Sequence, residues 1–407
     1  MSKLTKIIII ASAVLVLILA GAFTAISIAS YKPMVAFYNV PEKVQNCIVE
    51  EMKTLPAGKK GNPVKYEYVT LDVTIPLSKN KLAKKASIIF ANLDYDVKDF
   101  ALKNKNVNPL DTAMLETMPG TVRQASISEG KKLFAVPLLY DFYQFDINLF
   151  EFRNSGVESI NVWEDITNFW NKTKTEEQSP FIFSGGNDCN LLDFLGSLSE
   201  AFSGRNALIT AEEKLYEAFK TGKDENVKNC INELCTENGE LNQGLEALAA
   251  LYKNKTLNNS CLSFSDSDSL FYLDNNICNS AYLKLSSHRN INNSVINKYT
   301  SIYVPAKDPR ADRSFASPCI VAIPCSNKSY ISTAVNLLSS SRQATLSFKT
   351  GLAPVSASCS TPDRQADDVR FWIAASSGPD ISLSDSLPST KMKNIAAEAV
   401  RVLIKLY

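Results

Sequence analysis

Histidine is nearly absent from this chain of 407 residues, which contains only His288. A Ser-His or Cys-His nucleophile therefore has one possible base, and no C-x-x-C motif is present to build a zinc site of the usual spacing. The chain also lacks a G-x-S-x-G motif, a Walker loop and a dinucleotide-binding fingerprint. Carboxylate pairs such as Asp94 and Asp141 leave glycoside chemistry open, because a sequence gives no distance between them. We expect no enzyme, no bound metal and no cofactor.

An excess of charge of either sign is absent too. With 43 basic and 42 acidic residues the formal net charge is +1, which argues against a protein that binds nucleic acid by bulk electrostatics. Hydrophobic residues make up 45% of the chain, which is enough for a large core, and the length suits about two or three domains. We therefore expect a multi-domain globular protein with no nucleic-acid partner.

A long uncharged apolar run extends from Ile7 to Ala29, after Lys3 and Lys6. A positive start before an apolar stretch is typical of an exported protein. The run is longer than the apolar core of a typical signal peptide and long enough to span a bilayer. Residues 1–33 are therefore predicted to be a signal or anchor segment.

Two fates of this segment are open. Small residues at 20–22 and 27–29 have the form of cleavage sites, whereas Lys3 and Lys6 would hold an uncleaved anchor at its cytoplasmic end. The length favours the anchor, and no cysteine near the end of the run supports a lipoprotein. We place the rest of the chain in the periplasm or on the outer face of the inner membrane, N-terminally anchored or secreted.

Nine cysteines would enter an oxidising compartment, and their odd number leaves at least one without a partner in the chain. One interpretation is that most of them are small buried hydrophobic residues, because a core of this size needs no crosslinks. The other is a disulfide framework. The pairs nearest in sequence, and the first to test, are Cys230 with Cys235 and Cys319 with Cys325.

The first part of the chain alternates short apolar strands with helices. Residues 34–38, 65–73 and 86–91 have the composition of strands, and a helix is predicted to start at Pro41. Strand-helix alternation indicates parallel pairing, and ligands bind beyond the carboxyl ends of parallel strands. Topology alone therefore predicts that Tyr38 and Asn39, and residues Asn92 to Asp94, lie at the edge of a cleft.

Three separate stretches resemble one protein family. Residues 130–157 contain two lysines, an aromatic-rich apolar run broken by Pro137, and a glycine stop, and a predicted helix opens at Trp163. Further along, VAIP at 321–324 and SNK at 326–328 precede a helix and GLAPV at 351–355. A third stretch is NPLD at 108–111. In this order and separation, the stretches resemble the family 1 extracellular solute-binding proteins of ABC importers.

The resemblance implies an α/β chain with the two-lobed periplasmic-binding-protein type II fold, in which three crossings join the lobes. The crossings would lie near 139–141, 279–283 and 318–323. The first lobe would hold 34–138 plus 284–317, and the second 139–283 plus 318–407.

By the same resemblance, the chain would be the substrate-binding protein of an ABC transporter. It would capture a small solute, a carbohydrate, between its lobes, and its partners would be ABC permease subunits and, through the N-terminal segment, the membrane. Residues 276–282 lack the glycine and tryptophan usual at that point of the family, and a lipoprotein cysteine is missing. The alternative is therefore a diverged, non-transporting binding fold that acts as a membrane-anchored interaction or sensor protein.

A sugar offers hydroxyl groups and an apolar face, so its site calls for acidic and amide acceptors beside flat aromatic rings. Tyr140 and Asp141 are the strongest candidates, although strand alternation lets only one of them point into the cleft. For the aromatic residues the alternative is packing in a core. For Asn187 it is capping of the helix that follows Gly185-Gly186. The predicted ligand-binding residues are Tyr38, Asp94, Tyr140, Asp141, Asn187, Tyr282 and Trp372.

Overall fold

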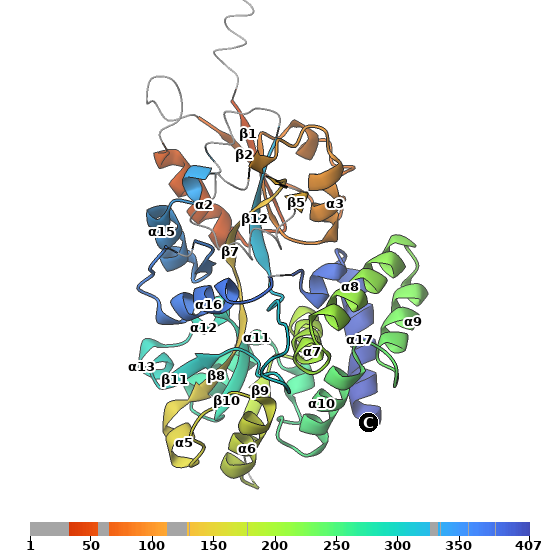
Figure 1. Ribbon diagram of the computed structural model, residues 1–407, viewed down its shortest axis with the longest axis vertical. Coiled ribbons are helices and arrows are strands. Elements are labelled where there is room, and N and C mark those ends of the chain that lie inside the picture. Colours follow the sequence, from red (N-terminus) through yellow and green to blue (C-terminus); the bar gives the residue numbers. More distant parts are fainter. Residues whose placement is uncertain are drawn as a thin grey trace, which may run out of the picture.

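The computed structural model describes residues 32–55, 65–111, 128–129, 131–176, 178–325, 333, 335–356, 358–378 and 380–407. These residues form two lobes, one above the other in Figure 1, and each lobe has its own sheet and its own hydrophobic core. The predicted α/β, two-lobed architecture is confirmed.

The predicted signal or anchor segment, 1–33, lies outside the described residues except for Lys32 and Pro33. The SNK stretch at 326–328 lies outside them as well. Among the helices of the described ranges, none is long and apolar enough to cross a membrane.

The first lobe is built on a six-stranded sheet with the order β13-β7-β12-β3-β1-β2. β1 pairs parallel with β2 and β3, as predicted, whereas β12 pairs antiparallel with β3 and β7. β3 and β12 are buried at every residue, which is typical of central strands covered on both faces. The strands are β1 (Met34–Tyr38), β2 (Glu67–Thr70), β3 (Ile88–Asn92), β7 (Val136–Tyr140), β12 (Cys319–Pro324) and β13 (Ala353–Pro354).

Within the described residues, the helices packed around this sheet are α2 (Glu42–Thr54), α3 (Tyr95–Lys103), α15 (Ser340–Thr350) and α16 (Arg364–Ala374). α2 shows why they pack there, because Val44, Ile48 and Met52 recur every fourth residue and all three are buried. α2 and α15 lie on one side of the sheet in Figure 1 and α3 on the other. The first lobe also contains a short 3-10 helix and a small three-stranded sheet: η1 (Ala83–Lys85), β4 (Leu110–Asp111), β5 (Ser128–Glu129) and β6 (Lys132–Leu133).

The second lobe has a four-stranded sheet with the order β11-β8-β10-β9. Its strands are β8 (Tyr143–Asn148), β9 (Phe181–Phe183), β10 (Ser280–Lys284) and β11 (Tyr299–Ile302). Near the sheet lie α5 (Leu149–Asn154), α6 (Trp163–Thr173), α11 (Asp266–Asp274), α12 (Leu285–His288), α13 (Asn293–Ile296) and the 3-10 helix η3 (Cys261–Ser263).

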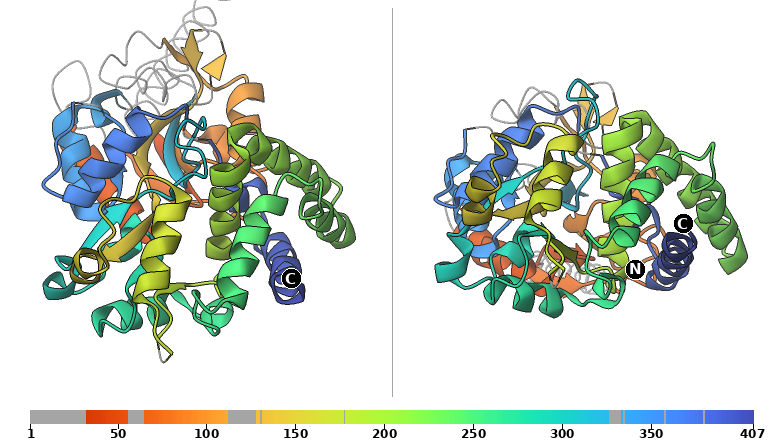
Figure 2. Two further views of the ribbon diagram at one scale, coloured as in Figure 1. Left: turned by 60° about the horizontal axis from the view of Figure 1, so that its bottom comes forward. Right: turned by 90° about the horizontal axis from the view of Figure 1, so that it is seen from below.

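Helices make up the other side of the second lobe. Figure 2 shows α8, α9, α10 and α17 grouped together on that side, and α7 packs against both α8 and α10. Their bounds are α7 (Asp188–Ser203), α8 (Arg205–Lys220), α9 (Asp224–Leu234), α10 (Asn242–Lys253) and α17 (Thr390–Leu406), with the 3-10 helix η4 (Leu383–Ser386) before α17.

In the part of the chain that the structure describes, three passages run between the lobes. The first passage, at Asp141 and Phe142, joins β7 to β8, which belong to different sheets. The second runs from β11 through residues 303–318 to β12, and the third runs from α16 to η4. The first passage overlaps the crossing predicted near 139–141 at Asp141, whereas residues 139 and 140 still belong to β7.

The predicted division of the chain after residue 283 is wrong. Residues 284–317 were assigned to the first lobe, but β11 pairs antiparallel with β8 in the second sheet. Residues 279–283 are not a crossing, because β10 pairs along its length with β8 and with β9. Residues 318–407 were assigned to the second lobe, yet β12, α15, β13 and α16 pack in the core of the first, and only the part from η4 onward joins the second.

Aromatic rings gather where two of the passages meet α16. Trp372 lies against Phe142 of the first passage and Tyr303 of the second, with ring centroids 5.6 Å away in each case. Phe315 packs against both Phe142, at 5.8 Å, and Tyr303, at 5.1 Å. These four rings join the passages to the first lobe.

All nine cysteines lie within the described residues, and each is a free thiol. The candidate pairs Cys230 with Cys235 and Cys319 with Cys325 are therefore not bonded. Six of the nine are buried, and burial raises the pKa of Cys325 to about 12. The structure thus agrees with the interpretation of most cysteines as small core residues.

Candidate functional site

A cavity of about 300 Å³ lies between the two lobes. The first lobe contributes Asn39, Asn92 and Ile320 to its wall, and the second contributes residues of α7, β10, η4 and α17. Asp141 and Pro318, at the ends of two passages, also reach it. Because both lobes and the connections line the cavity, any change in the angle between the lobes changes its shape.

Parallel strands bring the first-lobe amides to the cavity. Asn39 directly follows β1, and Asn92 is the last residue of β3, which pairs parallel with β1. Both residues thus lie at the carboxyl edge of the sheet, where ligand sites of parallel sheets are found. Asn39 has φ 53°, in the left-handed region that asparagine tolerates better than most residues.

Asp141 is held in the cavity wall by one residue of the second lobe. Its carboxylate accepts a hydrogen bond of 2.9 Å from the backbone N–H of Ser286 and one of 2.7 Å from the Ser286 hydroxyl. Desolvation raises the pKa of Asp141 above its ordinary value, and the positive charge of Lys284 acts in the opposite direction. Asp141 therefore presents a fixed acceptor to the cavity.

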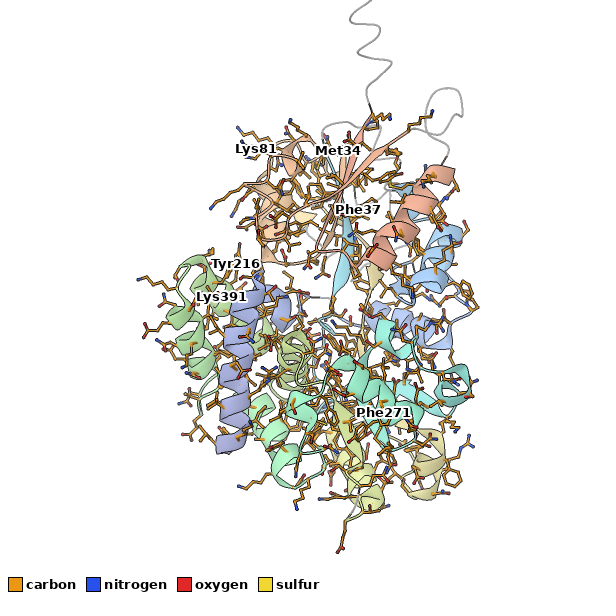
Figure 3. The ribbon with its side chains drawn as sticks, turned by 180° about the vertical axis from the view of Figure 1, so that it is seen from behind. Met34, Phe37, Lys81, Tyr216, Phe271 and Lys391 are labelled. Carbon is orange, nitrogen blue, oxygen red and sulfur yellow. The ribbon has the colours of Figure 1, made fainter. Side chains whose placement is uncertain are left out.

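Asp193 and Asp385 form the acidic part of the second-lobe wall. Asp193, on α7, accepts hydrogen bonds from the backbone N–H of Ser384 at 2.8 Å and from its hydroxyl at 3.0 Å. Asp385 lies 3.3 Å from Nζ of Lys393, at the start of α17. Burial, followed by the neighbouring charge of Asp385, raises the pKa of Asp193. Figure 3 shows the start of α17, marked by Lys391, at the level where the lobes meet.

Two lysines bring positive charge to the same wall. Burial alone would lower the pKa of Lys393, but the adjacent Asp385 raises it above its ordinary value. For Lys284, at the end of β10, burial is likewise outweighed by Asp141 and Asp193, and the pKa is raised. Its ammonium lies 5.2 Å from the centroid of the Tyr143 ring. Both lysines are therefore cations at neutral pH.

No protein-family model matches the sequence, and no curated protein matches it. Solved structures do match. The bacterial solute receptor AcbH, described as having an exclusive preference for β-D-galactopyranose, is 13% identical over 92% of this chain and 99% of its own, with a TM-score of 0.68. RafE from Streptococcus pneumoniae is 11% identical over 92% and 96%, with a TM-score of 0.63. Maltose-bound MalE3 of T. maritima is 13% identical over 92% and 100%, with a TM-score of 0.56.

The fold is that of the two-lobed solute-binding proteins. The match covers nearly the whole length of each of these proteins, so it includes both lobes and the passages between them. Identities of 11–13% establish the shape of the chain and not its ligand.

Of the seven predicted ligand-binding residues, Asp141 lines the cavity between the lobes. Tyr140, its neighbour, is buried with 1% of its surface exposed and does not line the cavity. The alternation of side chains along a strand explains this division, because neighbours point to opposite faces.

Unlike Asn39 and Asn92, Tyr38 and Asp94 were predicted at the cleft edge but do not line the cavity, and they stabilise the first lobe itself. Tyr38 is buried, and its hydroxyl donates to Asp96 at 3.3 Å. Asp94 caps α3 by accepting a hydrogen bond of 2.7 Å from the N–H of Val97. Burial raises the pKa of Asp94 to about 8, and Asp385 adds to the effect from the second lobe. Asp94 thus lies close to the interlobe charges without lining the cavity.

The other three predicted residues lie elsewhere. Asn187 caps α7, which agrees with the alternative interpretation of that position. Tyr282 is buried in the second lobe, where its ring stacks on Tyr143 at 5.0 Å and its hydroxyl lies 2.9 Å from that of Ser197. Trp372 is half-buried in the aromatic group at the passages and lines a separate hollow.

Besides Lys43 of the first lobe, the sequence missed four charged residues of the second-lobe wall: Asp193, Lys284, Asp385 and Lys393. They come from α7, β10, η4 and α17, so no short motif contains them. The sequence also predicted aromatic rings in the site, but none of the described residues that line the cavity is aromatic. Its apolar wall consists of aliphatic side chains such as Val44, Ile320 and Leu352.

Proposed function

We propose that this protein is the substrate-binding component of an ABC importer and captures a small solute, a carbohydrate, between its lobes. The observation that carries the proposal is a cavity whose polar side chains come from both lobes and from the passages that join them. A ligand that contacts both walls stabilises the closed arrangement of the lobes. Closure around the ligand by hinge motion is a known means of switching in such two-lobed proteins.

The chemistry of the cavity suits hydroxyl groups. Each hydroxyl donates one hydrogen bond and accepts others, so it is satisfied by a carboxylate on one side and an amide or ammonium on the other. The cavity supplies acceptors in Asp141 and Asp193 and donors in Asn92 and Lys284. That the structural neighbours include a receptor for galactopyranose and a maltose-bound protein supports the carbohydrate class.

The closed form would dock on ABC permease subunits, and the N-terminal apolar run would hold the protein at the outer face of the inner membrane or direct its export to the periplasm. The protein would bind its solute without turning it over. Lys3 and Lys6, followed by the apolar run from Ile7 to Ala29, support this location at the membrane or in the periplasm.

A thermal-shift screen across sugars, polyols and amino acids tests the binding function. A ligand present at about 100 times its dissociation constant should add about 2.7 kcal/mol to the free energy of unfolding. We expect a shift with a carbohydrate, recovery of the unchanged ligand after incubation, and a pair of permease genes beside the gene for this chain. A folded protein that shifts with no carbohydrate contradicts the proposal.

A further inference from the structure

The half-buried ammonium of Lys284 lines the cavity without a carboxylate in contact. Within the described residues no salt bridge joins Nζ of Lys284 to an acid at 4.0 Å or less, although Lys393 has such a partner in Asp385. Asp141 and Asp193 are the two acids whose charges act most strongly on this ammonium. A positive donor therefore faces two negative acceptors across a gap, and all three line the same cavity.

The two carboxylates are already oriented by the protein. Ser286 donates two hydrogen bonds to Asp141, and Ser384 donates two to Asp193. Each carboxylate oxygen can accept more than one hydrogen bond, so capacity remains on the side of the cavity. The gap between Lys284 and the two acids thus lacks a group that accepts from the ammonium and donates to a carboxylate.

A ligand hydroxyl is such a group, and charged ligand groups are not. A ligand carboxylate would accept from Lys284 but would be repelled by Asp141 and Asp193. A ligand ammonium would donate to the acids but would be repelled by Lys284. Lys43 also reaches the cavity, but it is exposed at the rim, where water and salt screen its charge. The arrangement of charges therefore favours a neutral ligand with neighbouring hydroxyl groups.

The size of the cavity limits how many sugar rings can bind. Ligand pockets span about 300–1,000 Å³, and this cavity, at about 300 Å³, is at the small end. None of the residues described around it supplies an aromatic surface on which a row of rings could stack. Binding strength must come from charge-assisted hydrogen bonds to a single ring, which are stronger than neutral ones.

We propose that the ligand is a single neutral monosaccharide, and that Lys284 selects it by bridging neighbouring hydroxyl groups toward Asp141 and Asp193. This rests on the proposed function, because it names the class of carbohydrate that the interlobe cavity takes. Lys284 thereby acts as a specificity residue: it donates to ring hydroxyls whose own protons the two acids accept. A sugar of two or more rings would leave some of these hydrogen bonds unmade, or would be too large for the lobes to close around it.

The first test compares ring number in the intact protein. Calorimetric titration with glucose, galactose, maltose and maltotriose should show a monosaccharide binding at least about tenfold more tightly than the di- and trisaccharide, which corresponds to about 1.4 kcal/mol. Tighter binding of maltose or maltotriose than of either single ring would overturn the inference and leave the proposed function standing. Absence of binding by any carbohydrate would remove both.

The second test addresses Lys284 itself. Lys284→Met keeps the length of the side chain and removes the charge, and it should weaken monosaccharide binding about tenfold or more. Lys405→Met, an exposed lysine on α17 that does not line the cavity, should change affinity less than about twofold. Equal affinities of the two variants would refute the role of Lys284. Circular dichroism confirms that each variant is folded, and if Lys284→Met is not, the comparison of ring number decides the inference.

Discussion

Tyr216 of the second lobe stacks on Tyr95 of the first, with ring centroids 4.7 Å apart and an interplanar angle of 25°. Tyr95 opens α3 and Tyr216 lies on α8, so this contact joins two helices across the interface. Tyr216 is 9% exposed and packs with the hydrophobic core of the first lobe rather than with that of its own. Its label in Figure 3 lies where the two lobes meet. The pair therefore fastens the lobes at a point away from the passages.

Tyr216→Ala should weaken solute binding by opening the lobes. An aromatic pair contributes about 0.5–1.5 kcal/mol beyond its buried area, so losing it should raise the dissociation constant about two- to tenfold. The cause is a smaller fraction of molecules in the closed, binding-competent form. Titration calorimetry measures the affinity, and small-angle X-ray scattering should show a larger radius for the free variant.

Phe271→Ala is the matched control for this ring, because Phe271 on α11 is 58% exposed and lies far from Tyr216 in Figure 3. It should leave both the affinity and the radius unchanged. If Tyr216→Ala binds as tightly as Phe271→Ala, the stacked pair does not govern closure.

Asp141 and Tyr140 are neighbours in sequence with different expected roles. Asp141→Asn keeps the shape and removes a charged acceptor from the cavity wall, which should cost about 1.5–3 kcal/mol of binding energy, or about tenfold or more in affinity. Tyr140→Phe changes a buried ring outside the cavity and should leave affinity within about twofold. Titrating both variants with the same monosaccharide measures the difference. A larger loss in Tyr140→Phe would show that the assignment of the two faces is reversed.

The second lobe depends on a buried acid that takes no part in the cavity. Asp146 accepts from His288 Nδ1 at 2.6 Å, from the Ser301 hydroxyl at 2.8 Å and from the Gln144 amide at 3.0 Å. Asp146→Ala leaves these groups buried without their acceptor and should lower the free energy of unfolding by about 3–5 kcal/mol. Urea unfolding measures the loss.

Asp308→Ala serves as the comparison for Asp146, since it removes an acid from an exposed pair with Arg310. The unfolding midpoint of this variant should stay at that of the unaltered protein. A midpoint for Asp146→Ala equal to that of Asp308→Ala would mean that the buried network does not stabilise the lobe.

Asp94 should make the protein less stable as the pH rises. Burial raises its pKa to about 8 in the folded chain, whereas an unfolded aspartate titrates near about 3.9. The unfolded form thus releases the proton first, and stability that is complete below about pH 4 is lost progressively up to about pH 8. Asp94→Asn still caps α3 and removes this titration.

The Asp94→Asn variant should therefore match the unaltered protein near pH 4 and be more stable than it near pH 9. Urea midpoints at the two pH values give the comparison, with the acid measurement as the internal control. An equal difference between the two proteins at both values would show that Asp94 is not the titrating group.

Much of the first lobe could be predicted from the sequence because its strands are short apolar runs between turn residues. Residues 34–38 and 86–91 were predicted as strands and contain or overlap β1 and β3. Residues 223–240 are mostly polar, a pattern that in a sequence favours a loop. The structure forms α9 there, with Val227, Ile231 and Leu234 buried at helical spacing. Three apolar residues are a weak indication of a helix in a sequence, but their burial is sufficient to pack this helix against the core.

The predicted division of the chain into lobes was wrong because strand pairing decides to which lobe a segment belongs. From the sequence, β10 and β11 could belong to either sheet, because the composition of a strand does not determine which strand it pairs with. For the same reason, the sequence predicted only part of the site. Asp141 was found because it follows a recognisable strand, whereas Asp193 and Lys393 meet only because η4 and α17 return to α7 near the end of the chain.

The aromatic group at the passages gives this protein an intrinsic optical signal. Its three tryptophans lie at 163, 170 and 372, and none of them lines the cavity, so a bound solute does not touch an indole ring. Trp163 and Trp170 pack against each other inside the second lobe, at 5.7 Å, and would move together with it. Trp372 instead touches Phe142 and Tyr303, which belong to two different passages. Rotation of the lobes would therefore change the surroundings of the Trp372 ring, and its emission would report the angle between the lobes rather than direct contact with a solute.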